Sequence, residues 1–198
     1  MRRLTIVLCL LTLLPPAASA GEPFAVKVER EPVNTAEPIY RAYVTVGEER
    51  FTFLIPEKYQ TGGDSAHGRL TLINVNTGSL ITFNFLDSTP GESPTPSPDA
   101  YREMLAGRYP GAKFTREFKR AALGRTGHVF EIEWKGQGDL AQKTRALYVP
   151  TSAGILELTA TSGIKNFRAT QALFDDFVGS ITPGVNGSLA VHRLQGVN

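Results

Sequence analysis

Cysteine is nearly absent from this chain of 198 residues, whose single cysteine is Cys9. Cys9 lies inside an apolar run near the N-terminus, and cleavage of a signal peptide would remove it. A mature chain without cysteine excludes disulfides, thiol nucleophiles and cysteine-based metal sites. An exported domain of this length can fold without disulfides, because its hydrophobic core is large enough to stabilise it.

The chain also lacks the sequence patterns of common catalytic and nucleotide-binding sites. It contains no GxSxG nucleophile elbow, no GxGxxG dinucleotide loop and no P-loop pattern. Histidine is scarce, with three residues in the whole chain. We therefore predict a protein that is not an enzyme and has no catalytic residue, no cofactor and no resident metal ion.

The N-terminal residues have the order of a secretory signal peptide. Two arginines come first, an apolar run extends from Leu4 to Leu14, and Ala18-Ser19-Ala20 follows. The apolar run is shorter than the ~20 residues that a membrane span needs, which disfavours a membrane anchor. We predict that residues 1–20 are a signal peptide cut after Ala20, and that the protein is periplasmic or secreted.

Net charge does not point to a polyanionic partner. The full chain has 21 basic and 19 acidic residues, and removal of Arg2 and Arg3 with the signal peptide makes the two numbers equal. A mature protein of zero net charge gives no electrostatic reason to expect nucleic acid or an anionic membrane as partner. After signal cleavage, no remaining run approaches the length of a membrane span.

Alternating apolar and polar residues predict mostly antiparallel strands. Residues 128–162 contain three apolar-rich runs separated by the turn sequences GQGD and PTSAG, which predicts a three-stranded meander. Residues 39–55 and 70–86 predict two hairpins, and Phe51, Phe53 and Ile55 share one face of the first. Further single strands are expected at 23–30 and 112–123, and a loop is expected at 56–69.

Two helices are predicted, one on each side of the meander in sequence. Ser97 is a favourable N-cap followed by proline, and Pro110-Gly111 would end this first helix. In residues 166–178 an apolar stripe repeats with helical spacing, with Asn166 as candidate cap and Gly179 as candidate stop. We expect one domain over residues 21–182 and a flexible tail over 183–198.

This order of elements resembles the PsbP/Mog-type superfamily, which includes PsbP-like and DcrB-like bacterial envelope proteins. The resemblance is carried by FTFLIPEKY at 51–59, LITFNFLD at 80–87, HVFEIEW at 128–134, RALYVPTSAGILELTATS at 145–162 and FRATQALFDDFVGSI at 167–181. It implies an α+β fold, an antiparallel β-sheet with helices packed on its two faces. It also implies a non-enzymatic adaptor or assembly role through contacts with a larger partner.

A basic run is the most distinctive candidate for a binding surface. Five basic residues lie within thirteen positions, with Glu117 as the only acid among them: Lys113, Arg116, Lys119, Arg120 and Arg125. These side chains could bind an acidic partner, since arginine pairs with carboxylates and phosphates in forked geometry. The interpretation that we favour is the solvated face of an edge strand, because charge runs are usually solvated.

Other polar residues favour structural interpretations. Ser65 and His67 lie in a Gly-rich loop that could belong to a hydrolase, although neighbours in one loop do not make a triad. Asp64, His67 and Asp87 would form a metal site only if their loops converged, which the sequence does not decide. His128 is either a histidine at the edge of a strand face or one side of a polar pocket. Asp175-Asp176 is interpreted as a solvated helix face.

Two functions from different classes follow. The first is an exported, non-enzymatic binding or assembly module with a protein partner in the cell envelope. The alternative is a carrier of a small ligand or lipid, because the strands 70–75 and 80–86 have apolar residues on both faces and could line a cavity. The sequence names neither the partner nor the oligomeric state.

Overall fold

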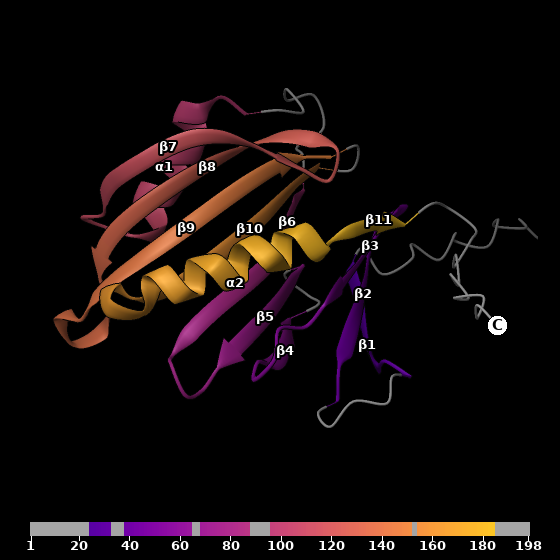
Figure 1. Cartoon of the computed structure of the whole chain (residues 1–198). Coiled ribbons are helices and arrows are strands. Elements are labelled where there is room, and N and C mark those ends of the chain that lie inside the picture. Colours follow the sequence, from indigo (N-terminus) through magenta and orange to yellow (C-terminus); the bar gives the residue numbers. More distant parts are fainter. Residues whose placement is uncertain (1–23, 33–37, 65–67, 88–95, 152–153, 185–198) are drawn as a thin grey trace, which may run out of the picture.

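The computed structural model describes residues 24–32, 38–64, 68–87, 96–151 and 154–184 (Figure 1). The expected signal peptide, residues 1–20, lies outside the described residues, as does most of the expected tail. Of that tail, Pro183 and Gly184 are described, and both belong to a short strand.

Eleven strands and two α-helices make up the described part of the chain. A four-stranded sheet contains β1 (Phe24–Arg30), β2 (Tyr40–Val46), β3 (Glu49–Leu54) and β11 (Thr182–Gly184), in this order across the sheet. A seven-stranded sheet has the order β4-β5-β6-β10-β9-β8-β7. Its strands are β4 (Gln60–Asp64), β5 (Arg69–Asn74), β6 (Ser79–Asp87), β7 (Lys113–Ala122), β8 (Arg125–Lys135), β9 (Ala141–Pro150) and β10 (Gly154–Gly163).

Every strand pair in both sheets is antiparallel, as the sequence predicted. The meander is confirmed as β8, β9 and β10, which lie side by side in the large sheet. The single sheet expected from the sequence is instead two sheets. The hairpin β2–β3 has its own apolar face, with Phe51 and Phe53 2% and 0% exposed, and this face packs against the large sheet. The ring of Phe53 stacks on that of Phe83 from β6 at 5.5 Å.

Helix α1 (Pro98–Arg108) begins as the sequence predicted. The Ser97 side chain accepts a hydrogen bond from the Ala100 N–H at 3.2 Å, and proline occupies the first turn. Tyr101 and Leu105 are fully buried, and the Tyr101 ring stacks on Tyr148 of β9 with centroids 4.3 Å apart. These contacts fix α1 over β8, β9 and β10.

Helix α2 (Phe167–Ser180) differs from its prediction at both ends. Asn166 makes no side-chain cap, because the short 3₁₀ turn Ile164–Asn166 leads into the helix with helical backbone, and its side chain donates to the Thr77 carbonyl instead. Gly179 does not end the helix, which extends through Ser180. The next residue, Ile181, is buried. The apolar stripe is confirmed except for Leu173, which is 38% exposed.

The two helices contact alternate residues along β9. On β9, Ala146 and Tyr148 belong to the cluster around α1, whereas Leu147 and Val149 belong to the cluster that contains the α2 residues. Successive side chains of a strand point to opposite faces. Figure 1 shows α2 running across the large sheet toward the four-stranded sheet, where Phe177 packs edge-on against Phe53 at 4.9 Å.

Three segments depart from the sequence expectations. Residues 60–64, expected in a loop, form β4, because pairing with β5 overrides the weak strand propensity of Gly62 and Gly63. The β5 strand is covered fully on one face only, and Ile73 is 41% exposed on the other. β11 extends the four-stranded sheet into residues assigned to the tail, since Pro183 lies opposite Phe51 in β3.

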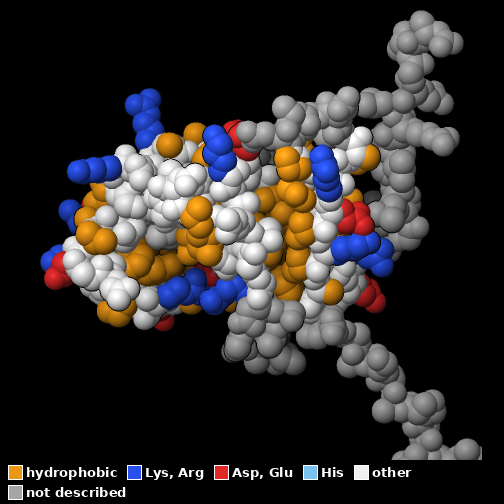
Figure 2. All heavy atoms as spheres, turned by 90° about the horizontal axis from the view of Figure 1, so that it is seen from below, with side chains coloured by type: hydrophobic (Ala, Val, Ile, Leu, Met, Phe, Trp, Pro, Cys, Tyr) orange, Lys and Arg blue, Asp and Glu red, His pale blue; other side chains and the backbone are white. Residues whose placement is uncertain are grey.

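Apolar side chains also reach the surface. Figure 2 shows a band of them across the middle of the face seen from below, with Lys and Arg side chains around it. The large apolar residues exposed in the described part are Val28, Ile39, Tyr40, Leu54, Ile73, Val75, Leu140, Ile164 and Leu173. No helix among the described residues combines the length and the hydropathy that crossing a bilayer requires.

Candidate functional site

Four of the five residues of the basic run lie on β7, the outermost strand of the seven-stranded sheet, where an irregularity changes which side chains share a face. Lys113 lies opposite Glu133, and Arg116 lies opposite Glu131, with a register shift between Phe114 and Arg116. In a regular strand, positions three apart would point to opposite faces. The bulge therefore places Lys113 and Arg116 on the same face, the use to which strand bulges are often put.

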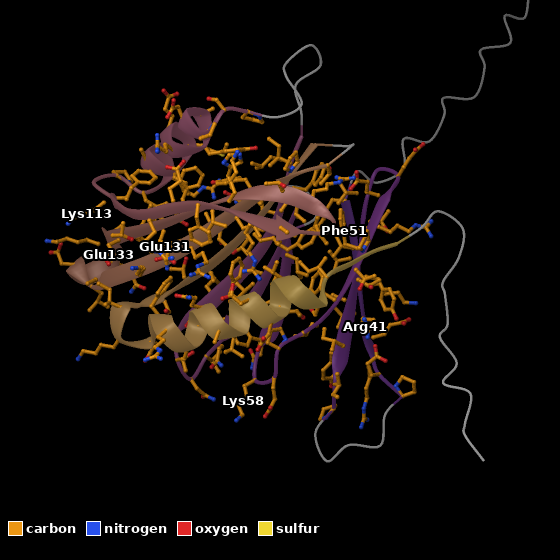
Figure 3. The ribbon with its side chains drawn as sticks, turned by 45° about the horizontal axis from the view of Figure 1, so that its top comes forward. Arg41, Phe51, Lys58, Lys113, Glu131 and Glu133 are labelled. Atoms are coloured by element: carbon orange, nitrogen blue, oxygen red, sulfur yellow. The ribbon has the colours of Figure 1, made fainter. Side chains whose placement is uncertain are left out.

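Behind these two residues, charges alternate across three strands. One row runs from Lys113 through Glu133 on β8 to Lys143 on β9. The next row runs from Arg116 through Glu131 to Arg145 in the same way. Opposite charges that face each other on neighbouring strands attract, so both rows support the pairing of β7, β8 and β9. Figure 3 labels Lys113, Glu131 and Glu133 together at one end of the large sheet.

Glu131 lies at the centre of the arrangement and its side chain is only 2% exposed. Its Oε1 accepts hydrogen bonds from Nε and Nη2 of Arg145 at 3.1 and 2.6 Å. Nζ of Lys143 lies 3.5 Å from Oε2, and Nη1 of Arg116 lies 3.6 Å from Oε1. Three cations therefore compensate one buried carboxylate.

Asp175 of α2 completes the arrangement from above the sheet. Its carboxylate accepts hydrogen bonds from Nη1 of Arg145 at 3.1 and 3.2 Å and from Arg120 of β7. Asp176 is exposed as predicted, whereas Asp175 is 37% exposed and also pairs with two arginines of the sheet, which the prediction of a solvated helix face did not include. Through Arg145 and Arg120 the helix is tied to two strands.

We call these eight side chains the charged cluster: Lys113, Arg116, Arg120, Lys143, Arg145, Glu131, Glu133 and Asp175. Five cations and three carboxylates leave an excess of two positive charges. The buried pair of Glu131 and Arg145 forms its floor, whereas the Arg116 side chain is 59% exposed and stands over the Phe118 ring at 5.1 Å. An exposed cationic edge above a compensated floor can pair with carboxylates or phosphates of another molecule.

The other two predicted basic residues lie elsewhere. Lys119 pairs with His128 in register, which places it on the α1 side of the sheet, away from the charged cluster. Arg125 follows the turn between β7 and β8, donates to the Pro150 carbonyl at 3.0 Å and lies 3.7 Å from Glu49. The structure thus brings together three of the five predicted residues.

His128 belongs to a polar row on the α1 side of the sheet. In register, His128 lies opposite Tyr148, Tyr148 opposite Glu157, and Glu157 opposite Asn84. The sequence offered an edge histidine or one side of a polar pocket, and the structure shows a half-buried histidine, 6.1 Å from the Tyr101 ring. Burial, and then the neighbouring Glu157 carboxylate, raise the pKa of Tyr148 far above its ordinary value.

Glu157 is the second buried carboxylate of the large sheet, and its side chain is 1% exposed. It accepts hydrogen bonds from Arg108 at 2.7 Å and from Asn84 at 2.9 Å. Burial alone would lower the pKa of Arg108, but the attraction of Glu157 outweighs it and the pKa is raised. The ion pair ties the last turn of α1 to β10.

His67 and Ser65 lie outside the described residues, as do the side chains of Asp64 and Asp87. Within the described ranges, no group of three or more His, Cys, Asp or Glu side chains is arranged to hold a metal ion.

Two groups of residues in the charged cluster were not predicted from the sequence: the acids on β8 and the cations on β9. Glu131 and Glu133 were interpreted as the polar half of an alternating strand, and Lys143 and Arg145 were not considered. A partial signal was present, since the meander prediction places the first run, which contains Glu131 and Glu133, beside the run from Arg145 to Val149, which begins with a cation. Lys143 lies before that predicted run, because β9 begins earlier, at Ala141.

No family model matches the chain, and no curated protein matches it. Solved structures are similar in fold. Cyanobacterial PsbP (CyanoP) from Synechocystis sp. PCC 6803 has 12% identity and a TM-score of 0.52, covering 66% of this chain and 85% of that one. LpqN of Mycobacterium tuberculosis, described as involved in cell envelope biogenesis, has 11% identity and a TM-score of 0.51, covering 81% and 92%.

A third structure, the Ran-binding protein Mog1p of Saccharomyces cerevisiae, has 7% identity and a TM-score of 0.49, covering 66% of this chain and 88% of that one. Sequence identities this low support a similarity of fold and no statement about function. With its antiparallel sheets and two helices, the chain has a PsbP/Mog-type fold.

Proposed function

We propose that this protein is an exported, non-enzymatic binding or assembly module of the PsbP-like type, which acts through protein–protein contacts in the cell envelope. The signal-peptide pattern of residues 1–20 supports export, and the description of LpqN as a protein of cell envelope biogenesis agrees with that location. We also propose that α1 and α2 cover opposite faces of the large sheet, since they contact β9 residues of opposite parity.

The observation that carries the proposal is the charge excess of the charged cluster. The mature chain as predicted is neutral overall, yet two positive charges remain uncompensated around β7 and β9. The contact surface that we propose is its rim on the α2 side, which consists of the exposed Lys113 and Arg116 and the partly exposed Arg120. Because exposed charges act mainly on association rate and on the choice of partner, we expect an acidic partner surface and salt-sensitive binding.

The edge position of β7 suits this role. Its outer side has no strand partner among the described residues, and its cations discourage pairing with other sheets while they stay available to a partner. Arg116 is the most exposed arginine of the rim, and its contact with Glu131 at 3.6 Å is weak enough to be exchanged.

The test is crosslinked capture from the envelope fraction of the native host, with matched variants. Lys113→Glu combined with Arg116→Gln changes the rim, and Lys119→Glu combined with Arg102→Gln makes the same charge change on the α1 side. Gln rather than Glu at 116 avoids a like charge beside the buried Glu131. We expect the rim variant to lose most of the captured partner and the control variant to retain it. Equal capture by the two variants would refute the proposed surface.

The alternative of a small-ligand carrier is supported by one observation, a shallow open pocket of about 170 Å³ on the α1 side of the large sheet. It is smaller than the ~300–1,000 Å³ typical of pockets that enclose drug-sized ligands. The apolar faces of β5 and β6 do not line it, since Leu72 and Phe83 are fully buried in the core between the sheets. This alternative therefore concerns a small polar ligand rather than a lipid.

A further inference from the structure

The seven-stranded sheet has a second polar surface, and α1 leaves it open. The helix contacts β8, β9 and the start of β10, whereas the α1-side faces of β5 and β6 bear partly exposed side chains. There the pocket of about 170 Å³ is lined by Arg69, Thr71, Thr82, Arg108, Glu157 and Thr159. The pocket lies on the opposite side of the sheet from the rim of the charged cluster, so the inference is independent of the protein-binding proposal and deepens the small-ligand alternative.

The floor of the pocket is unusual for a structural site. Glu157 is 1% exposed in the middle of a sheet, and its contacts with Arg108 and Asn84 only compensate the cost of burying its charge. Replacing both partners of a buried ion pair by apolar residues is often neutral or stabilising, so stability alone does not account for this pair, and it opens onto the pocket.

The charged donors around the pocket are the guanidinium groups of Arg69 and Arg108. Both oxygens of Glu157 already accept hydrogen bonds, whereas its ion pair with Arg108 uses only Nη1 of that guanidinium. Arg69 and the three threonine hydroxyls supply further donors. A ligand that satisfies these donors must bring acceptor oxygens.

Charge and size narrow the ligand further. Two guanidinium groups, those of Arg69 and Arg108, and one carboxylate, that of Glu157, line the pocket, and Asp64 of β4 lies directly opposite Arg69 in register. Guanidinium groups bind planar carboxylates in forked geometry. The volume of about 170 Å³ suits a small molecule, and Leu80 and Tyr109 offer apolar contact to a short carbon chain. We propose that this pocket binds a small organic acid through its single carboxylate.

The probes are acetate, its neutral analogue acetamide, and inorganic phosphate, each titrated into the isotope-labelled protein and followed by NMR. We expect saturable shifts with acetate, centred on β5, β6 and β10, and none with acetamide. Phosphate, a dianion in part at neutral pH, should bind more weakly than acetate. No saturable shift with acetate, equal shifts with acetamide, or tighter binding of phosphate would each overturn the proposal.

Arg69→Gln is the informative variant, because Arg69 is exposed at the pocket and its replacement leaves the pair of Glu157 and Arg108 intact. We expect it to weaken acetate binding at least tenfold, while Arg102→Gln, an exposed arginine of α1 outside the pocket, leaves it unchanged. Thr82→Val, which removes one donor with little change of shape, should weaken binding by a smaller factor. An unchanged affinity in Arg69→Gln would contradict the assigned site.

Discussion

Replacement of Arg145 by Met should destabilise the protein much more than replacement of Arg116 by Met, although both arginines contact Glu131. The Arg145 side chain is 5% exposed and bonds both Glu131 and Asp175, whereas that of Arg116 is 59% exposed. Removing one partner of a buried ion pair costs ~3–5 kcal/mol, because it leaves the other charge buried and uncompensated. Lys143 remains 3.5 Å from Glu131, so we expect the lower end of this range, about 3 kcal/mol.

Urea unfolding measures this difference directly. With a slope of about 2 kcal/mol per molar urea, a loss of about 3 kcal/mol lowers the midpoint by about 1.5 M. Arg116→Met should lower it by less than about 0.5 M, since exposed pairs contribute ~0–1 kcal/mol. The double variant Glu131→Leu, Arg145→Met should recover most of the loss, because it removes both buried charges. A midpoint for Arg145→Met equal to that of Arg116→Met, or no recovery in the double variant, would refute the role assigned to the buried pair.

Three further predictions concern the core, a strand contact and titration. Phe177→Ala should cost ~3–5 kcal/mol in urea unfolding, because it opens a cavity where α2 meets both sheets, whereas Leu173→Ala on the exposed side should cost far less. Gly127→Ala should lower the melting temperature, since the Cβ of the alanine would lie 2.7 Å from the Tyr148 carbonyl oxygen. An unchanged melting temperature would mean that β9 moves to make room for the methyl group. Burial raises the pKa of Tyr59, Tyr101 and Tyr148 above the ordinary 10.0. These tyrosines therefore keep their protons to a higher pH in the folded state than in the unfolded chain. Their contribution to the free energy of unfolding is complete below about pH 10 and is lost as the pH rises further. Tyrosinate absorbance from these residues should appear only together with loss of circular dichroism.

The sequence predicted the elements of the fold well because their signals are local. Alternation in 128–162 predicted β8, β9 and β10, and Ser97 with its following proline predicted the start of α1. β4 was not predicted, because residues 60–64 form a strand through their pairing with β5 and not through their own strand propensity. The division into two sheets depends on the packing of Phe53 against Phe83 and Phe177, a tertiary contact that no local pattern contains.

The candidate site could be predicted only in part. The basic run was visible as composition, but its division between two faces depends on the bulge between Phe114 and Arg116. A period of two places Lys113 and Arg116 on opposite faces, and an irregularity of one residue reverses this. The acids that neutralise the run lie on β8 and α2, at sequence distances where only the register of the sheet brings them near.

Site-specific photo-crosslinking on β7 tests the central claim most directly. A photoreactive residue replaces either Lys113 on the α2 side or Lys119 on the α1 side, in the full-length chain expressed in its native host. The two positions lie on one strand and both are exposed, so they differ chiefly in the face that they present. We predict a crosslink to one envelope protein from position 113 and none from position 119, with the crosslink reduced at high salt. Crosslinks from both positions alike, or from position 119 alone, would contradict a protein-binding surface at the charged cluster.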